Sequence, residues 1–416
     1  MVIRHISALV AAFLLAPYLI AADVKLGPEM ALAPNDPDAQ ADVRIALGPR
    51  GAFAVWNDPG RYEVSAAIDG KAITVDETDA QDWVGWPAVS AGAHGFLVVW
   101  RHNVVSNNDR VLARRYDFDG NPIDAAPMTL DTSPYAGFRF DETPPSIAFD
   151  GTTFLVAWTR GLNSSGYDTP TKLYTTRIRE DGQPFDARET TVAPNSGATI
   201  TIRPRGPRVL WTGSEFVVIL NIEYSGHAGG PYLDRSMLAI RFDHAYNPLS
   251  VASVFHFNNL SSLGVAASSG PSRLTYSWSD DMQSIVVAQT TADGRSLRAP
   301  RVIVPRKYTD GSTAAEVVWN GTEHVLVWLD GSPYGSAPGK LFAIRLDTNL
   351  EPLDAEPFQI YSEPGFFSNP SLIATPNGVL IAYTRLDSAK GNSPRVFART
   401  LERLTQQSPH RRPAGR

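Results

Sequence analysis

The chain has 416 residues, with 37 lysine and arginine residues against 43 aspartate and glutamate residues, and it contains no cysteine. The lack of cysteine excludes disulfides, thiolate nucleophiles and cysteine-based metal sites. A formal net charge of −6 without a basic stripe argues against nucleic-acid binding.

Residues 1–22 have the pattern of a secretory signal peptide. Arg4 and His5 precede an apolar stretch from Ile6 to Ile20, and Ala22 offers a small residue for cleavage. The apolar stretch is short for a membrane span, and a retained N-terminal anchor is the alternative. We therefore expect a mature chain without a membrane span that is secreted or periplasmic.

Short apolar runs recur along nearly the whole chain with a period of about 40 to 60 residues. Each run lies among further strand-like segments separated by turns rich in glycine and proline. Four strands per repeat with this period predict a β-propeller in which each repeat forms one blade. The runs end at Trp56, Trp100, Trp158, Leu220, Trp278, Trp328 and Tyr383.

Each repeat is expected to contribute four antiparallel strands. The first follows a Pro-x-Val pattern or a variant of it, as in Pro87–Ser90 and Pro207–Trp211. The second is the apolar run, which is apolar at successive positions as if both of its faces were covered. The third is rich in arginine and valine, as in Arg110–Tyr116. The fourth follows a turn of the type Asp-Gly-x-Pro and is expected at Asp124–Leu130, Asp186–Val192 and Asp354–Ile360.

Counting these units gives seven, and the two ends of the chain complete the last one. Asn369–Leu404 supplies three strands and then stops, whereas Lys25–Ala33 resembles the fourth strands of other repeats. The predicted fold is all-β, a seven-bladed β-propeller whose last blade is closed by an N-terminal strand. We expect one domain over residues 23–404, with Leu263–Pro305 as its least regular blade, and a disordered basic tail over residues 405–416.

The connections of such a fold divide between two faces. The longer ones are predicted on the face that carries the loops between second and third strands and the connections between blades. These loops are rich in aromatic residues and arginine, which suit sugar rings, acidic groups or a protein surface. Packing of the loops onto the disc is the alternative role for any one of these side chains. Residues that precede the innermost strands, such as Asn369 and Thr313, are expected to ring the channel mouth. The predicted ligand-binding residues are Trp86, Arg139, Glu142, Arg160, Arg205 and Tyr232.

No catalytic or metal motif is evident. Asp117-x-Asp119-Gly120 resembles a fragment of a calcium loop, but other repeats do not keep its spacing, and a hairpin turn explains it. The eight histidines form no zinc motif, and no Gly-x-Ser-x-Gly elbow exists. We expect no metal and no cofactor, and the catalytic residues, if any, are unknown. Carboxylates near the loop-rich face, such as Asp280 and Asp330, leave glycoside chemistry open.

The apolar run followed by Arg-x-Asp-x-Asp-Gly-x-Pro-x-Asp resembles exported bacterial proteins built from propeller repeats. It occurs at Phe96–Trp100 with Arg115–Asp124, and in a variant form at Phe154–Trp158 with Arg177–Asp186. The likeness spans roughly residues 43–404 and implies the fold, but it carries over no catalytic residue.

We therefore expect an exported, monomeric, non-catalytic propeller that binds a glycan, peptide or protein through its long-loop face. The alternatives are a carbohydrate-active hydrolase or lyase with carboxylates at the channel mouth, and a purely structural part of the cell envelope.

Overall fold

A computed structural model describes residues 24–58, 62–77, 83–104, 108–133, 144–161, 171–183, 188–190, 201–225, 232–243, 246–257, 266–270, 273–279, 284–305, 315–330, 339–361 and 369–403. The expected signal peptide and basic tail lie outside these residues.

Seven antiparallel sheets form the blades, which we number in chain order by their first strands. Blade 1 contains β3 (Ala41–Gly48), β4 (Gly51–Asp58), β5 (Glu63–Ile68) and β6 (Lys71–Glu77). Blade 2 contains β7 (Trp83–Ala91), β8 (Phe96–Val104), β9 (Asn108–Tyr116) and β10 (Met128–Ser133). Blade 3 contains β11 (Ser146–Phe149), β12 (Thr153–Gly161), β13 (Thr171–Arg179) and β14 (Arg188–Thr190).

The second half of the ring follows the same plan. Blade 4 contains β15 (Thr201–Trp211), β16 (Phe216–Ser225), β17 (Tyr232–Phe242) and β18 (Pro248–Phe257). Blade 5 contains β19 (Ala266–Gly270), β20 (Arg273–Ser279), β21 (Ile285–Thr291) and β22 (Arg301–Val304). Blade 6 contains β23 (Ala315–Trp319), β24 (His324–Asp330), β25 (Lys340–Leu346) and β26 (Phe358–Tyr361). Blade 7 contains β27 (Ser371–Thr375), β28 (Gly378–Asp387) and β29 (Ser393–Arg403), joined by β1 (Val24–Leu26) and β2 (Met30–Ala31).

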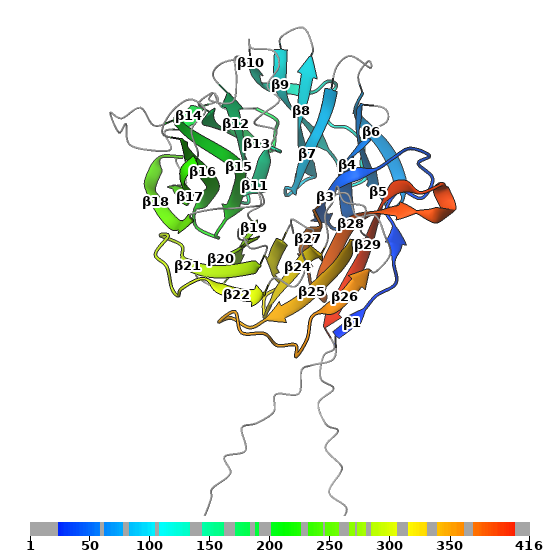
Figure 1. The fold of residues 1–416 in the computed structure, drawn as a ribbon. Coiled ribbons are helices and arrows are strands. Elements are labelled where there is room, and N and C mark those ends of the chain that lie inside the picture. The colour runs from blue at the N-terminus through cyan, green and yellow to red at the C-terminus, as the bar shows by residue number, and fades with distance from the viewer. Residues whose placement is uncertain are drawn as a thin grey trace, which may run out of the picture.

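The first strands of the blades surround the centre of the disc (Figure 1). Each of them contacts the first strand of the next blade, and β27 contacts β3, so the ring is closed. This arrangement confirms the predicted seven-bladed β-propeller. Blade 5, which was expected to be the least regular, forms a four-stranded sheet in the same order as blades 3, 4 and 6. The only helix within the described residues is the short 3-10 helix η1 (Ser388–Lys390), and none there could cross a membrane.

The segment Lys25–Ala33 closes the last blade as predicted. Both β1 and β2 pair with β29 in antiparallel register, so the final sheet gains its outer strand from the other end of the chain. Between these two strands, the Glu29 carboxylate accepts hydrogen bonds of 2.7 Å from the Tyr383 hydroxyl and from Nη2 of Arg385. Burial opposes ionisation of Glu29, but these bonds outweigh it and lower its pKa. The closing strand is therefore held by a charged group as well as by pairing.

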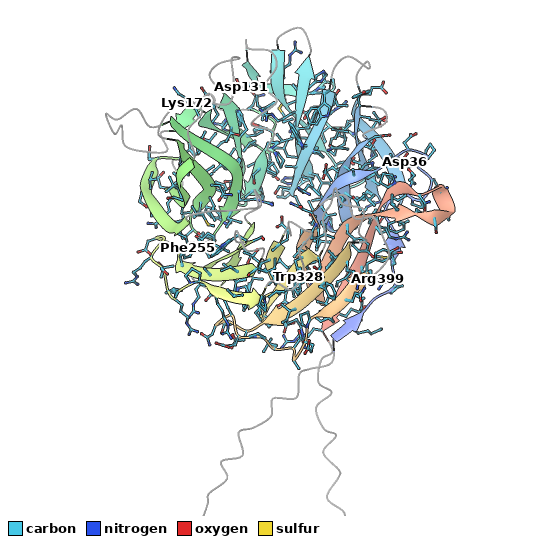
Figure 2. The ribbon with its side chains drawn as sticks, in the orientation of Figure 1. Asp36, Asp131, Lys172, Phe255, Trp328 and Arg399 are labelled. Carbon is cyan, nitrogen blue, oxygen red and sulfur yellow. The ribbon has the colours of Figure 1, made fainter. Side chains whose placement is uncertain are left out.

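The apolar runs become the second strands of the blades, and they are buried on both faces. In blades 2 and 3 the tryptophan that ends the run also bonds to the preceding blade. Nε1 of Trp100 donates to Asp76 at 2.6 Å, and Nε1 of Trp158 donates to Asp131 at 2.9 Å. Asp131 is labelled in Figure 2, where side chains fill the space between neighbouring sheets. The recurring tryptophan is thus a structural element that fixes one blade on the next.

The predicted starts of the fourth strands were wrong by a few residues in blades 2, 3 and 6, and in blades 2 and 6 the turn before the strand is longer than expected. Asp124 accepts from the backbone N of Arg115 at 2.9 Å and from its Nη2 at 2.5 Å. Asp354 holds Arg345 in the same way, at 2.8 and 2.6 Å. The last aspartate of the repeat motif therefore fixes an arginine of the third strand, and the fourth strand begins four residues later in both blades.

The hairpins between second and third strands also extend further than predicted. In blade 2 the connection shrinks to residues 105–107, and in blade 7 to residues 388–392. In the connections between blades, β7 begins at Trp83 and β15 at Thr201, so part of each predicted loop is strand. Continued pairing satisfies the backbone groups of these segments. The contrast between a face of long loops and a face of short turns is therefore smaller than the sequence indicates.

Candidate functional site

A cavity of about 300 Å³ lies on the axis of the ring. We call it the axial cavity, because nearly all of its lining comes from the first strands of five blades. Its walls combine charged, hydroxyl and aromatic side chains, a mixture typical of sites that orient a polar ligand. The lining residues are Arg44, Arg208, Leu210, Ser268, Glu316, Val317, Val318, Trp319, Pro370, Ser371 and Leu372.

The polar residues occupy one position of the repeat. In the Pro-x-Val pattern, the middle residue is Arg208 in blade 4 and Ser371 in blade 7, and Glu316 and Arg44 hold the corresponding place in blades 6 and 1. Because side chains alternate along a strand, the side chain of this residue points away from the face to which its two neighbours in the strand point. The Ser371 hydroxyl accepts a hydrogen bond of 3.2 Å from the backbone N of Ile45 in the next blade. One repeat position thus supplies most of the cavity's chemistry.

An ion pair spans the cavity between blades that are not neighbours. Nη2 of Arg208 in blade 4 lies 2.5 Å from Oε1 of Glu316 in blade 6, across the small residues of β19 in blade 5. Arg44 lines the same cavity, and within the described residues it forms no ion pair. Burial, and after it the like charge of Arg208, lowers the pKa of Arg44. The cavity therefore holds one arginine whose charge is only partly compensated.

The backbone near this cluster is irregular in three blades. Bulges interrupt the pairing of β3, β7 and β15, and the residue that begins each bulge has a positive φ: Asp42 at 54°, Trp86 at 51° and Gly206 at 56°. Positive φ is costly for residues other than glycine, and such strain concentrates at functional sites. Burial raises the pKa of Asp42, although Arg44 and a hydrogen bond of 3.2 Å from Asn57 favour its ionised form.

Ser268 supplies a further polar group to the axial cavity. The residue is only 8% exposed, and among the described residues its hydroxyl has no hydrogen-bond partner. A buried hydroxyl without a partner is costly, so a ligand that bonds to it would gain that free energy back. Trp319 forms another wall, and its indole lies 4.7 Å from the His324 ring, measured between ring centroids.

Trp86 lies in β7, where its indole packs on Trp83 with 4.1 Å between ring centroids. The guanidinium of Arg101 lies 5.7 Å from the Trp86 ring, so this predicted residue joins an aromatic and cationic cluster beside the bulge. The predicted residues Arg160, Arg205 and Tyr232 lie in β12, β15 and β17, but their side chains are outside what the structure describes, and Arg139 and Glu142 are outside the described residues altogether.

The channel mouth was predicted just before each first strand, as at Asn369, whereas the axial cavity is built mainly from residues inside these strands. Arg44, Arg208 and Glu316 were missed for this reason. The available signal was the middle residue of Pro-x-Val, which changes from alanine to serine, arginine or glutamate between blades. In the described part of the chain, no group of three histidine, aspartate or glutamate residues could hold a metal ion.

No protein-family model and no curated protein matches this chain. Solved structures with similar folds include the Trypanosoma rangeli sialidase in complex with the inhibitor DANA, with a TM-score of 0.50 at 8% identity over 90% of this chain and 60% of the sialidase. An α-L-arabinofuranosidase from Fusarium graminearum gives 0.45 at 13% identity over 92% and 99% of the two chains. The GH43 endo-arabinanase from Bacillus licheniformis gives 0.36 at 11% identity over 63% and 94%. At these identities the similarity concerns the propeller fold alone.

Proposed function

We propose that this protein is an exported, non-catalytic propeller that binds an acidic saccharide in its axial cavity. The observation that carries the proposal is the partly compensated arginine, Arg44, beside the Arg208–Glu316 pair in one cavity. An arginine fork binds a carboxylate through two parallel hydrogen bonds. The acidic group of the ligand would thus complete the charge balance of the cavity.

The remaining walls match the other parts of a sugar. The hydroxyls of Ser268 and Ser371 and the carboxylate of Glu316 can bond to ring hydroxyls, and the Trp319 indole offers an apolar face for the ring. A volume of about 300 Å³ lies at the small end of ligand pockets, which suits one sugar unit or the end of a chain. The similar fold of a sialidase makes saccharides a sensible first class of ligand to test.

Binding without catalysis is favoured by the way the carboxylates are used. Glycoside hydrolysis generally needs two carboxyl groups on either side of the bond that is cleaved. Among the described lining residues Glu316 is the one carboxylate, and Arg208 already holds it. The described lining of the cavity therefore has several groups that could bind a sugar but only one carboxylate that could take part in cleavage.

One observation favours a carbohydrate-active hydrolase or lyase as the second candidate. Asp42 lies two residues before Arg44 in β3, and burial raises its pKa, as is common for a general acid. Asp42 and Glu316 would then be the two carboxyl groups of the reaction.

Calorimetric titration at pH 7 with digalacturonate and with the neutral sugar galactose tests the binding proposal. We expect saturable 1:1 binding of digalacturonate and at least tenfold weaker binding of galactose. Arg44→Gln should weaken digalacturonate binding at least tenfold. The matched control is Arg50→Gln in the same blade, because Arg50 is an exposed residue that pairs with Asp119 and does not line the axial cavity. Equal affinity for both sugars, or unchanged affinity in Arg44→Gln, would contradict the proposal.

A reducing-end assay on uronic-acid and neutral polysaccharides separates the two candidates. The binding proposal expects no release of sugar ends. Release that disappears in both Asp42→Asn and Glu316→Gln would replace it with the enzymatic candidate.

A further inference from the structure

A second cavity, of about 290 Å³, lies between blades 5 and 6, on the side of the ring that carries the tight turns. We call it the interblade pocket. It is separate from the axial cavity except for Trp319, whose indole borders both. Its lining residues are Gly270, Arg273, Gln289, Trp319, His324 and Thr348.

Blade 5 continues its first hairpin one pair further out than blades 3, 4 and 6 do. In those three blades the last pair of the hairpin consists of two aromatic rings in contact, with 4.6 Å between centroids for Phe149–Phe154, 5.0 Å for Trp211–Phe216 and 4.7 Å for Trp319–His324. In blade 5 the hairpin extends to Gly270, which pairs with Arg273. This extra pair places a residue without a side chain beside Trp319 and a cation in the lining of the pocket.

Blade 6 departs from the repeat at the facing position. Four residues before the end of its apolar run, the second strand carries a buried phenylalanine in blades 2, 3 and 4, but His324 in blade 6, where it is only 2% exposed. Burying a polar ring at a core position costs free energy unless its nitrogens form hydrogen bonds. The phenylalanines at this position are Phe96, Phe154 and Phe216.

A directed chain of hydrogen bonds starts at this histidine. Burial lowers the pKa of His324 to about 4, so the ring is neutral at pH 7. Its Nδ1 lies 3.3 Å from the carbonyl oxygen of Asp347, so Nδ1 carries the proton and Nε2 accepts from the Thr275 hydroxyl at 2.8 Å. Gln289 Nε2 donates to Thr275 at 3.4 Å, and its Oε1 accepts from Nη1 of Arg273 at 3.3 Å. The chain therefore fixes the Arg273 guanidinium at its end.

The charge at the end of this chain is not balanced by a carboxylate. Within the described residues Arg273 forms no ion pair, and its other acceptor is the carbonyl oxygen of Thr348 at 3.0 Å. A second arginine on the same side, Arg298, likewise bonds to the amide oxygen of Asn349 at 2.9 Å and to no acid. A positioned, partly buried guanidinium beside an aromatic wall is the usual arrangement for binding a carboxylate or phosphate.

We propose that the interblade pocket is a second ligand site, which binds a small organic anion through Arg273 with the apolar part of the molecule against Trp319. The anionic group is a carboxylate or a phosphate. Gly270 leaves the space for the apolar part, and Gln289 holds the guanidinium in place. This inference does not depend on the axial cavity.

Phenyl phosphate and benzoate serve as probes, with benzyl alcohol as the neutral probe of similar shape. Each is titrated at pH 7.5 into protein labelled with ¹⁵N at histidine and tryptophan, and the His324 and Trp319 ring signals are followed by NMR. We expect saturable shifts with at least one anion and at least tenfold weaker binding of the alcohol. A response to both anions means that the site accepts either group, and a response to one identifies the group.

Three variants make the test specific. Arg273→Gln removes the charge and should weaken binding at least tenfold. Gly270→Val should abolish binding by filling the pocket, since a Cβ at this position meets Trp319 at 3.5 Å, which is ordinary contact. Arg298→Gln, the matched control, should change affinity less than twofold. If no anion gives saturable shifts, or Arg273→Gln binds as tightly as the wild type, the proposal is overturned. The Arg44→Gln variant should leave these titrations unchanged, which distinguishes this site from the axial one.

Discussion

The boundary between blades 2 and 3 and the boundary between blades 5 and 6 use the same repeat with different chemistry. At the first, Trp158 is buried and bonded to Asp131 of the preceding blade, and the closing aromatic pair fills the turn side. At the second, a glycine, an arginine and a buried histidine line a polar hollow. The comparison indicates that a closed ring keeps its shape when one boundary has polar groups in place of apolar packing.

Trp158→Ala tests the packed boundary and has the largest expected effect. The side chain is 1% exposed, and its removal leaves a cavity and removes the hydrogen bond from the indole to Asp131. We expect a loss of roughly 3–5 kcal/mol in the free energy of unfolding, measured by urea denaturation. Trp319→Ala, at the hollow boundary, is the control and should cost less than half as much, because Trp319 already faces open space. Equal losses would show that the two boundaries are packed alike.

The pH dependence of stability sharpens the comparison next. The pKa of His324 falls from 6.5 to about 4 on folding, so the unfolded chain binds a proton first as the pH drops. Stability from this residue is fully present above pH 6.5 and is lost as the pH falls towards 4, by about 3 kcal/mol for the whole shift. Urea denaturation at several pH values should show this slope in the wild type.

His324→Phe, which introduces the residue found at this position in blades 2, 3 and 4, should remove the slope between pH 6.5 and 4. Carboxylates with lowered pKa values, such as Asp124 and Asp150, change the free energy of unfolding only at more acidic pH, and their contribution should be the same in both proteins. An unchanged slope in the variant would refute the assignment of this titration to His324.

Gly270→Ala has the smallest expected effect on stability. The backbone of Gly270 is outside the positive-φ region, and an added Cβ makes ordinary contacts with Trp319 and His324. We therefore expect a gain of roughly 0.4–1 kcal/mol in the free energy of unfolding. Gly378→Ala provides the contrast, because its φ is 150° and the new Cβ would lie 1.9 Å from the carbonyl oxygen of Leu401. A loss of stability in Gly270→Ala would contradict this expectation and would mean that the added methyl group does not fit beside Trp319.

The ring and its closure could be predicted because the apolar runs repeat, and because strands buried on both faces need apolar residues at every position. The strand ends could not, since Asp124 belongs to a turn that depends on a contact with Arg115. The axial cavity was missed because Arg44, Arg208 and Glu316 are far apart in sequence and share only a place in the repeat. Their meeting follows from the closing of the ring, which no local pattern encodes.

The pairing of β1 with β29 has a consequence for how the molecule folds. In blades 1 to 6 every hydrogen-bonded strand is the chain neighbour of its partner, so these sheets can form while synthesis continues. The pairing of Leu26 with Leu401 spans nearly the whole polypeptide, which raises the contact order and the entropy that must be lost in a single late step. Until β29 leaves the ribosome, the growing protein is an open arc with two bare sheet edges, and the period before closure is when it is most exposed to aggregation.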